Sequence, residues 1–165
     1  MFQLDSAPTA YDEGRGGVVA GRDTVRLFPG AAAVLQRLLD DRRYASIQVA
    51  VASSTTEPAW ANRCLDVCRI DPARGECIAD VVSQRQIYPG SKGSQHFPKL
   101  RSATGVSFDE MIFWDDCTYG DNCGDVATKC AGTTCVRTPN GLTLELFEAG
   151  LAAFARGEKG VVGPR

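Results

Sequence analysis

Five polar residues stand directly after three apolar stretches of the chain, where they could bind a phosphate group and a metal ion. They are Ser53 and Ser54, Lys92, and the pair Asp115 and Asp116. A phosphoryl dianion needs positive charge and hydrogen-bond donors, which a lysine ammonium and two hydroxyls supply. Paired carboxylates suit a hard cation such as Mg²⁺, which takes oxygen ligands. These residue types together indicate phosphate chemistry assisted by magnesium.

The stretches before these residues have the length and composition of strands. Residues 46–52 alternate isoleucine and valine with small or amide residues, and residues 111–114 are the run Met-Ile-Phe-Trp. Because residues 46–52 have no charge, they suit a strand that is covered on both faces. Two short extended segments, at 79–82 and 85–88, precede the turn Pro89-Gly90. We therefore expect the polar residues to follow strands.

Helical patterns alternate with these strands along the chain. Capping residues, prolines and apolar periodicity predict helices at about 31–41, 57–68, 91–104, 122–131 and 144–155. A further strand is predicted at 133–138. This alternation favours an α/β fold with a parallel sheet and helices on both of its faces. Ligands of such sheets bind beyond the carboxyl ends of the strands, which is where the five polar residues stand.

Each of these residues also has an ordinary structural explanation. Ser53 alone could cap a helix, Lys92 could be a surface lysine, and two adjacent acids are often solvated. Their joint position at successive strand ends is what favours a site. The turn Gly90–Gly93 lacks the spacing of a P-loop. In a receiver domain the acidic pair would precede the lysine, whereas here the lysine comes first.

Three segments match, in order, the second, third and fourth motifs of the haloacid dehalogenase-like hydrolases. They are residues 51–57, 87–92 and 111–116, with the sequences VASSTTE, IYPGSK and MIFWDD. These motifs resemble the magnesium-dependent phosphatase 1 family within that superfamily. The resemblance extends over residues 24–157 and implies a three-layer, Rossmann-like α/β fold with a parallel sheet and no large cap. We expect that domain at 24–157, an irregular segment at 1–23 and a frayed tail at 158–165.

The resemblance also implies an activity and a role for each site residue. Family members hydrolyse phosphomonoesters through an aspartyl-phosphate with Mg²⁺ as cofactor, and phosphotyrosine and sugar phosphates are among their substrate classes. Ser53 corresponds to the hydroxyl that contacts the phosphoryl group, with Ser54 beside it. Lys92 corresponds to the lysine that offsets charge on the nucleophile and the phosphate. Asp116 corresponds to the magnesium ligand, and Asp115 to a residue that orients it or a coordinated water.

The first motif of that family, a buried strand that ends in Asp-x-Asp, has no counterpart in the sequence. In the family its first aspartate attacks phosphorus, and its strand lies in the middle of the sheet. Neither Asp5 nor Asp12 follows an apolar strand. Without this strand the fold would lose the burial of about five side chains, which contribute roughly 1.5–3 kcal/mol each. Their sum is comparable with the whole stability of a domain, about 5–15 kcal/mol. We therefore expect a chain truncated at its N-terminus, poorly soluble and inactive towards phosphomonoesters.

Two other interpretations remain open at this point. The chain could be a non-catalytic phosphate-binding or interaction module that begins at Met1. It could also be a different α/β enzyme with a reactive thiol near Cys117, although the neighbouring Asp115 and Asp116 disfavour a thiolate there.

Length and charge limit the kind of protein and its partners. The chain has 165 residues, which is the length of one domain. Eighteen Lys and Arg against 20 Asp and Glu give a net charge of −2 without a basic run, so nothing indicates a nucleic-acid or membrane surface. No apolar stretch approaches the roughly 20 residues of a spanning helix, and the first twenty residues lack the basic start and apolar block that a signal peptide would show. We expect a cytoplasmic monomer that acts on a phosphorylated small molecule or a phosphoprotein.

The seven cysteines show no metal-binding pattern. They never form a C-x-x-C pair, and His96 is the only histidine that could complete a zinc site. We expect reduced thiols, several of them buried as small apolar groups.

Overall fold

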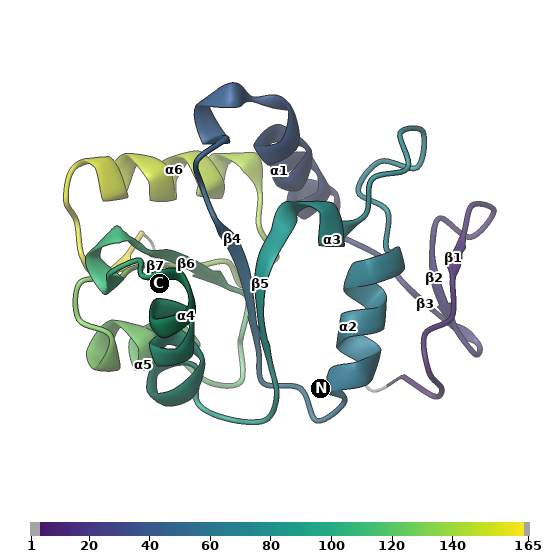
Figure 1. The fold of residues 1–165 in the computed structure, drawn as a ribbon, viewed down its shortest axis with the longest axis horizontal. Coiled ribbons are helices and arrows are strands. Elements are labelled where there is room, and N and C mark those ends of the chain that lie inside the picture. The colour runs from purple at the N-terminus through teal and green to yellow at the C-terminus, as the bar shows by residue number, and fades with distance from the viewer. Residues whose placement is uncertain (1–3, 164–165) are drawn as a thin grey trace.

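A computed structural model of the chain describes residues 4–163. Strands and helices alternate along most of this length, as Figure 1 shows. The parallel sheets and the helices around them confirm the predicted Rossmann-like α/β fold. None of the described helices has the length and apolarity to cross a membrane.

The N-terminal part of the chain forms a small antiparallel sheet. Its three strands are β1 (Tyr11–Asp12), β2 (Gly17–Ala20) and β3 (Asp23–Val25). Val18 and Ala20 of β2 are fully buried, so the prediction of an irregular segment at 1–23 is wrong for residues 11–23. Two of the glycines that suggested a loop, Gly16 and Gly21, lie in the turns before and after β2. Their φ angles of 62° and 59° are ones that glycine adopts readily, and such angles suit hairpin turns. Residues 1–3 of that segment lie outside the described residues.

Two parallel sheets form the rest of the strand structure. In the first, β4 (Val49–Ser53) pairs with β5 (Val82–Ile87), and Ser53 lies opposite Ile87. In the second, β7 (Thr134–Arg137) lies between β6 (Ile112–Asp115) and β8 (Gly160–Val162). Within residues 4–163, neither the second edge of β4 nor that of β6 pairs with a strand.

This topology explains why β4 is less buried than its composition suggests. Ala50 is exposed, the other residues of β4 are half-buried, and Ile47 just before it is 46% exposed. The sequence predicts a strand covered on both faces at 46–52. That prediction is wrong about coverage, because no described strand continues the sheet beyond β4.

The helices begin where the sequence places prolines or capping residues. Pro29, Pro58 and Pro98 lie in the first turns of their helices, where a missing N–H costs nothing. The α-helices are α1 (Pro29–Asp40), α2 (Pro58–Val67), α3 (Ile78–Val81), α4 (Phe97–Thr104), α5 (Asn122–Lys129) and α6 (Leu144–Ala155). Three short helices of other types are η1 (Arg42–Tyr44), η2 (Lys92–His96) and η3 (Phe108–Glu110).

Helices cover both faces of β6, because neighbouring side chains of a strand point in opposite directions. Phe113 packs edge-on against Phe97 of α4, with ring centroids 5.0 Å apart. Trp114 packs against Phe147 of α6 on the other face, with centroids 5.5 Å apart. These contacts give the three layers that the resemblance implies.

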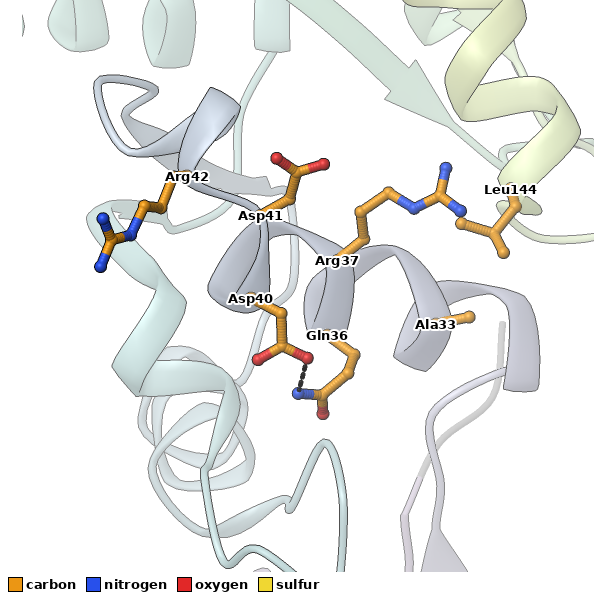
Figure 2. A pocket seen from close by; sticks show the side chains of 7 residues that line it. All are labelled: Ala33, Gln36, Arg37, Asp40, Asp41, Arg42 and Leu144. Carbon is orange, nitrogen blue, oxygen red and sulfur yellow. Dashed lines mark hydrogen bonds between the residues drawn. The ribbon is translucent and has the colours of Figure 1, made fainter.

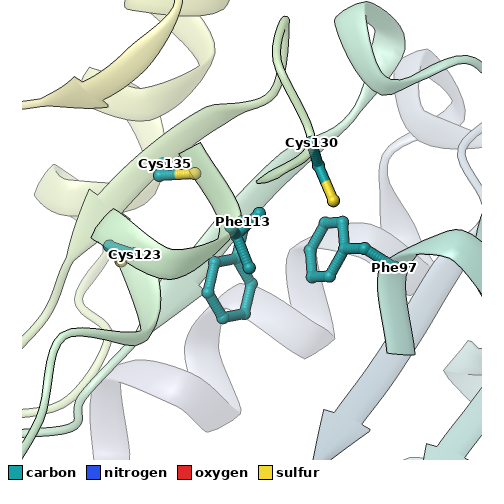
Figure 3. Packing of buried hydrophobic residues seen from close by; sticks show 6 residues of the cluster. Phe97, Phe113, Cys123, Cys130 and Cys135 are labelled. Atoms are coloured by element: carbon teal, nitrogen blue, oxygen red, sulfur yellow. The ribbon is translucent and has the colours of Figure 1, made fainter. Parts of the chain in front are cut away.

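One part of the core lies between β6, α4 and α5 and contains three of the cysteines. Figure 3 shows five of its residues as labelled sticks. All seven cysteines are free thiols, as predicted. The four that are buried are Cys68, Cys123, Cys130 and Cys135. They fill space as small apolar groups.

Two further segments differ from the expectations. Residues 78–81 form α3 rather than an extended segment, because Asp80 accepts a hydrogen bond from the Cys77 N–H at 2.7 Å and completes a capping box. The tail at 158–165 is not frayed over residues 160–162, since these pair with β7 as β8. Residues 164–165 lie outside the described residues.

Candidate phosphate and metal site

The predicted site residues lie at or just beyond the carboxyl ends of three parallel strands. Ser53 is the last residue of β4, Lys92 follows the turn after β5, and Asp115 is the last residue of β6. This edge of an open α/β sheet is where ligands bind.

Lys92 and Asp115 form a buried ion pair. The Lys92 Nζ atom lies 2.7 Å from Asp115 Oδ2, and the two side chains are only 11% and 8% exposed. Lys92 Nζ also lies 5.5 Å from the centre of the Phe113 ring, within range of a cation–π contact. The structure therefore brings together the ends of β5 and β6 through two residues that the sequence placed in one site.

Both carboxylate oxygens of Asp115 accept hydrogen bonds. Oδ1 accepts hydrogen bonds from the Asn122 Nδ2 at 2.9 Å and from the Cys117 N–H at 3.0 Å. Oδ2 is held by Lys92. Three donors thus fix the Asp115 carboxylate in one orientation.

Asp116 differs from its neighbour in every one of these respects. It is exposed, and within the described part of the chain its carboxylate makes no hydrogen bond or ion pair. Its oxygens are therefore available to a ligand in solution. The structure does not bring Asp116 into contact with Lys92, Ser53 or Ser54.

The two serines differ in how their hydroxyls are used. Ser54 Oγ donates to the Gly90 carbonyl at 2.8 Å and so ties the end of β4 to the turn after β5. The Ser53 hydroxyl makes no hydrogen bond within residues 4–163 and remains a free donor. Ser53 is instead held through its backbone carbonyl, which accepts the Tyr88 N–H at 3.0 Å.

His96 fixes the same strand ends from inside the protein. It is fully buried, and its ring stacks on Tyr88 with centroids 4.3 Å apart. Its Nε2 lies 3.1 Å from the Ser53 carbonyl oxygen and 3.0 Å from that of Tyr88, and its Nδ1 lies 3.2 Å from that of Ser91. Both ring nitrogens face carbonyl oxygens, so every N–H that the ring holds has an acceptor.

Gly93 allows the loop that contains Lys92 to approach α5 closely. A Cβ atom at this position would lie 2.6 Å from the Asp125 carbonyl oxygen, closer than real Cβ contacts come. A side chain here would push the loop away from the helix and shift Lys92.

A hollow of the surface also lies elsewhere, along α1. It measures about 540 Å³ and is lined by the seven side chains shown in Figure 2. Its charges are of both signs, and Asp40 is already bound by Gln36 at 2.9 Å and by Arg74 at 2.8 Å. It is lined by none of the predicted site residues. We therefore place the site at the strand ends.

Comparison with known proteins identifies the family of this chain. The sequence profile of the Acid Phosphatase family matches residues 2–157, which is nearly the whole length. The chain belongs to the Acid Phosphatase family. No solved structure gives a significant match.

Two curated relatives of this Acid Phosphatase family member agree with that assignment. The chain is 37% identical over 140 residues to Magnesium-dependent phosphatase 1 of Homo sapiens, a match that covers 85% of this chain and 69% of the relative. It is 28% identical over 81 residues to a HAD-like hydrolase superfamily protein of Schizosaccharomyces pombe. That second match covers 48% of this chain and 46% of the relative. The resemblance to magnesium-dependent phosphatase 1 is thereby confirmed.

Thiol chemistry finds little support in this family member. Burial, and then the charge of Asp115, raises the pKa of Cys123 to about 12. Burial likewise raises the pKa of Cys135 to about 12. Thiols with such pKa values are not nucleophilic near neutral pH. Cys123 and Cys135 are therefore not candidate nucleophiles, and a reactive thiol near Cys117 stays a prediction.

Three residues around the site were not predicted from the sequence as members of it. They are His96, Asn122 and Asp125, and each acts on a predicted residue or on its loop. The sequence signal for Asn122 and Asp125 was their spacing of three residues at the start of the helix that follows the acidic pair. His96 gave no such signal, because its partners are backbone carbonyls.

Proposed function

We propose that this chain binds a phosphomonoester together with Mg²⁺ at the carboxyl ends of β4, β5 and β6. The observation that supports this most is the buried contact between Lys92 and Asp115, beside the unengaged carboxylate of Asp116. The reaction class of the family is magnesium-dependent phosphomonoester hydrolysis, in line with the name of the human relative, and the resemblance implies an aspartyl-phosphate intermediate. Candidate substrates are phosphorylated small molecules, such as sugar phosphates, and phosphotyrosine-containing proteins.

The residues at the strand ends have distinct roles in this proposal. The Lys92 ammonium offsets the negative charge of the phosphoryl group, and its own pair with Asp115 keeps it in place. The free Ser53 hydroxyl donates to a phosphoryl oxygen. Ser54 holds the β4 end against Gly90 and supports Ser53 from the neighbouring position.

The donor set at Asp116 fits magnesium. Its free carboxylate is the kind of oxygen ligand that Mg²⁺ prefers. Asp115 beside it would orient Asp116 or a coordinated water. Within residues 4–163 there is no group of three His, Cys, Asp or Glu residues that could hold a metal. Mg²⁺ commonly takes one or two protein carboxylates and completes its shell with waters and substrate phosphate. When bound, the ion would polarise the phosphoryl oxygens.

The attacking carboxylate is the part that the sequence does not supply. The 165 residues contain no Asp-x-Asp, and Asp115 is engaged by three donors. In our proposal these residues therefore bind phosphate and Mg²⁺ without turning over a phosphomonoester. A non-catalytic phosphate-binding or interaction module is the second candidate, and the same lack of Asp-x-Asp favours it.

Ligand titrations with the full 165-residue chain test this proposal. We expect orthophosphate binding by calorimetry that strengthens when Mg²⁺ is present, and no release of p-nitrophenol from p-nitrophenyl phosphate. Substitution Asp116→Asn should remove the effect of Mg²⁺ and leave binding of phosphate alone nearly unchanged. Absence of phosphate binding by the parent chain would overturn both candidates. Turnover of the aryl phosphate would contradict the proposed inactivity.

A further inference from the structure

Helix α5 presents two polar side chains to the site from one of its faces. Asn122 and Asp125 are three residues apart, so they are neighbours on the helix surface. The start of α5 is set by Asp121, whose side chain accepts the Gly124 N–H at 2.9 Å and pairs with Arg137 at 2.7 Å. This cap determines where Asn122 and Asp125 lie relative to the strand ends.

The two side chains bind different parts of the candidate site. Asn122 donates to Asp115, the last residue of β6, at 2.9 Å. Asp125 Oδ2 accepts hydrogen bonds from the Ser91 hydroxyl at 2.8 Å and from the Gly93 N–H at 2.9 Å. Ser91 and Gly93 are the residues on either side of Lys92. One helix therefore contacts both Asp115, next to the proposed metal ligand Asp116, and the proposed phosphate loop.

Asp125 is charged when it makes these contacts. Burial raises the pKa of its carboxyl, but hydrogen bonds from Lys129, Gly93 and Ser91 outweigh that effect and lower the pKa below its usual value. Lys129 Nζ lies 2.6 Å from Asp125 Oδ1. Hydrogen bonds to a charged carboxylate are shorter and stronger than those between neutral groups. The loop around Lys92 is therefore held firmly against α5.

We propose that Asn122 and Asp125 are positioning residues with separate tasks. Asn122 orients Asp115 and through it the metal end of the site, whereas Asp125 orients the loop of Lys92 and so the phosphate end. Neither residue acts on the ligand directly. The inference rests on the proposed function, because it assigns one ligand to each end of the site.

Two separate titrations, one with Mg²⁺ alone and one with orthophosphate alone, test this inference. We expect each variant to weaken the binding of one ligand much more than that of the other. Asn122→Ala should weaken Mg²⁺ binding about tenfold, as expected for loss of a group that supports a metal ligand, and change phosphate binding less than about threefold. Asp125→Asn should weaken orthophosphate binding about tenfold and change Mg²⁺ binding less than about threefold. Substitution of a residue with a merely structural role would weaken the binding of both ligands together.

A matched control comes from the same helix. Thr128 is exposed on α5 and its side chain makes no hydrogen bond within the described residues, so Thr128→Ala should leave both affinities unchanged. Thermal unfolding of all three variants shows whether α5 remains folded. Backbone amide signals of Lys92 and Asp116 report the two ends independently: Asp125→Asn should shift the Lys92 signal, and Asn122→Ala that of Asp116.

The possible outcomes separate this inference from the function on which it rests. Equal losses of affinity for both ligands in both variants, or no loss of affinity in either variant, would overturn the proposal of separate tasks. A parent chain that binds neither ligand overturns the proposed function instead. The amide signals then decide the positioning roles by themselves: shifts larger than those in Thr128→Ala support them, and unchanged signals refute them.

Discussion

Replacement of Lys92 by methionine is expected to lower the free energy of unfolding by about 3–5 kcal/mol and to abolish orthophosphate binding. The substitution leaves the Asp115 carboxylate, only 8% exposed, without its countercharge. Breaking one partner of a buried ion pair is costly because the remaining charge stays out of water. The measurement is urea unfolding followed by tryptophan fluorescence, together with a phosphate titration.

A double variant separates the two effects of Lys92. Lys92→Met combined with Asp115→Asn removes the unpaired charge, so it should recover most of the stability but none of the phosphate binding. Lys159→Met is the matched control, since Lys159 is exposed and forms no salt bridge with a carboxylate within residues 4–163. Its Nζ donates to the Asp109 carbonyl at 2.6 Å and lies 4.8 Å from the centre of the Phe154 ring. It should change stability by less than about 0.5 kcal/mol. A Lys92→Met chain that unfolds like the parent would show that the pair is not buried as described.

His96→Ala is expected to destabilise the chain by about 2–5 kcal/mol. The substitution opens a cavity in a fully buried position and removes the ring that stacks on Tyr88. It also removes Nε2, which lies within hydrogen-bond distance of the carbonyl oxygens of Ser53 and Tyr88. Because these carbonyls lie at the ends of β4 and β5, we expect weaker orthophosphate binding as well. Urea unfolding and calorimetry measure the two effects.

His96→Gln is the informative comparison for this histidine. The glutamine amide keeps N–H donors and much of the volume, so it should lose clearly less stability than alanine. Similar losses for both substitutions would assign the effect to ring packing rather than to hydrogen bonds. An alanine variant within about 0.5 kcal/mol of the parent would contradict the role of His96 altogether.

The fold and part of the site could be predicted from the sequence for clear physical reasons. Alternating apolar and helical patterns favour parallel strands, and residues that follow such strands meet at one edge of the sheet. This argument placed Lys92 and Asp115 together, and the structure has them 2.7 Å apart. The roles of Ser53, Ser54 and Asp116 stay predictions, since each depends on a bound ligand.

Other features depend on contacts that no local pattern encodes. The strand β8 exists because Gly160–Val162 returns to pair with β7, and three residues give little signal by themselves. The glycines at 16 and 21 suit either a loop or hairpin turns, and burial of Val18 decides between them. His96 could not be assigned because its partners are carbonyls from three separate points of the chain.

The most direct test of the account is a crystal structure of the 165-residue chain with Mg²⁺ and orthophosphate. The account predicts one phosphate that contacts the Ser53 hydroxyl and the Lys92 ammonium, with Mg²⁺ bound between it and Asp116. It would be contradicted by phosphate and metal at separate places, or by distances from Ser53, Lys92 and Asp116 that no single phosphate could span.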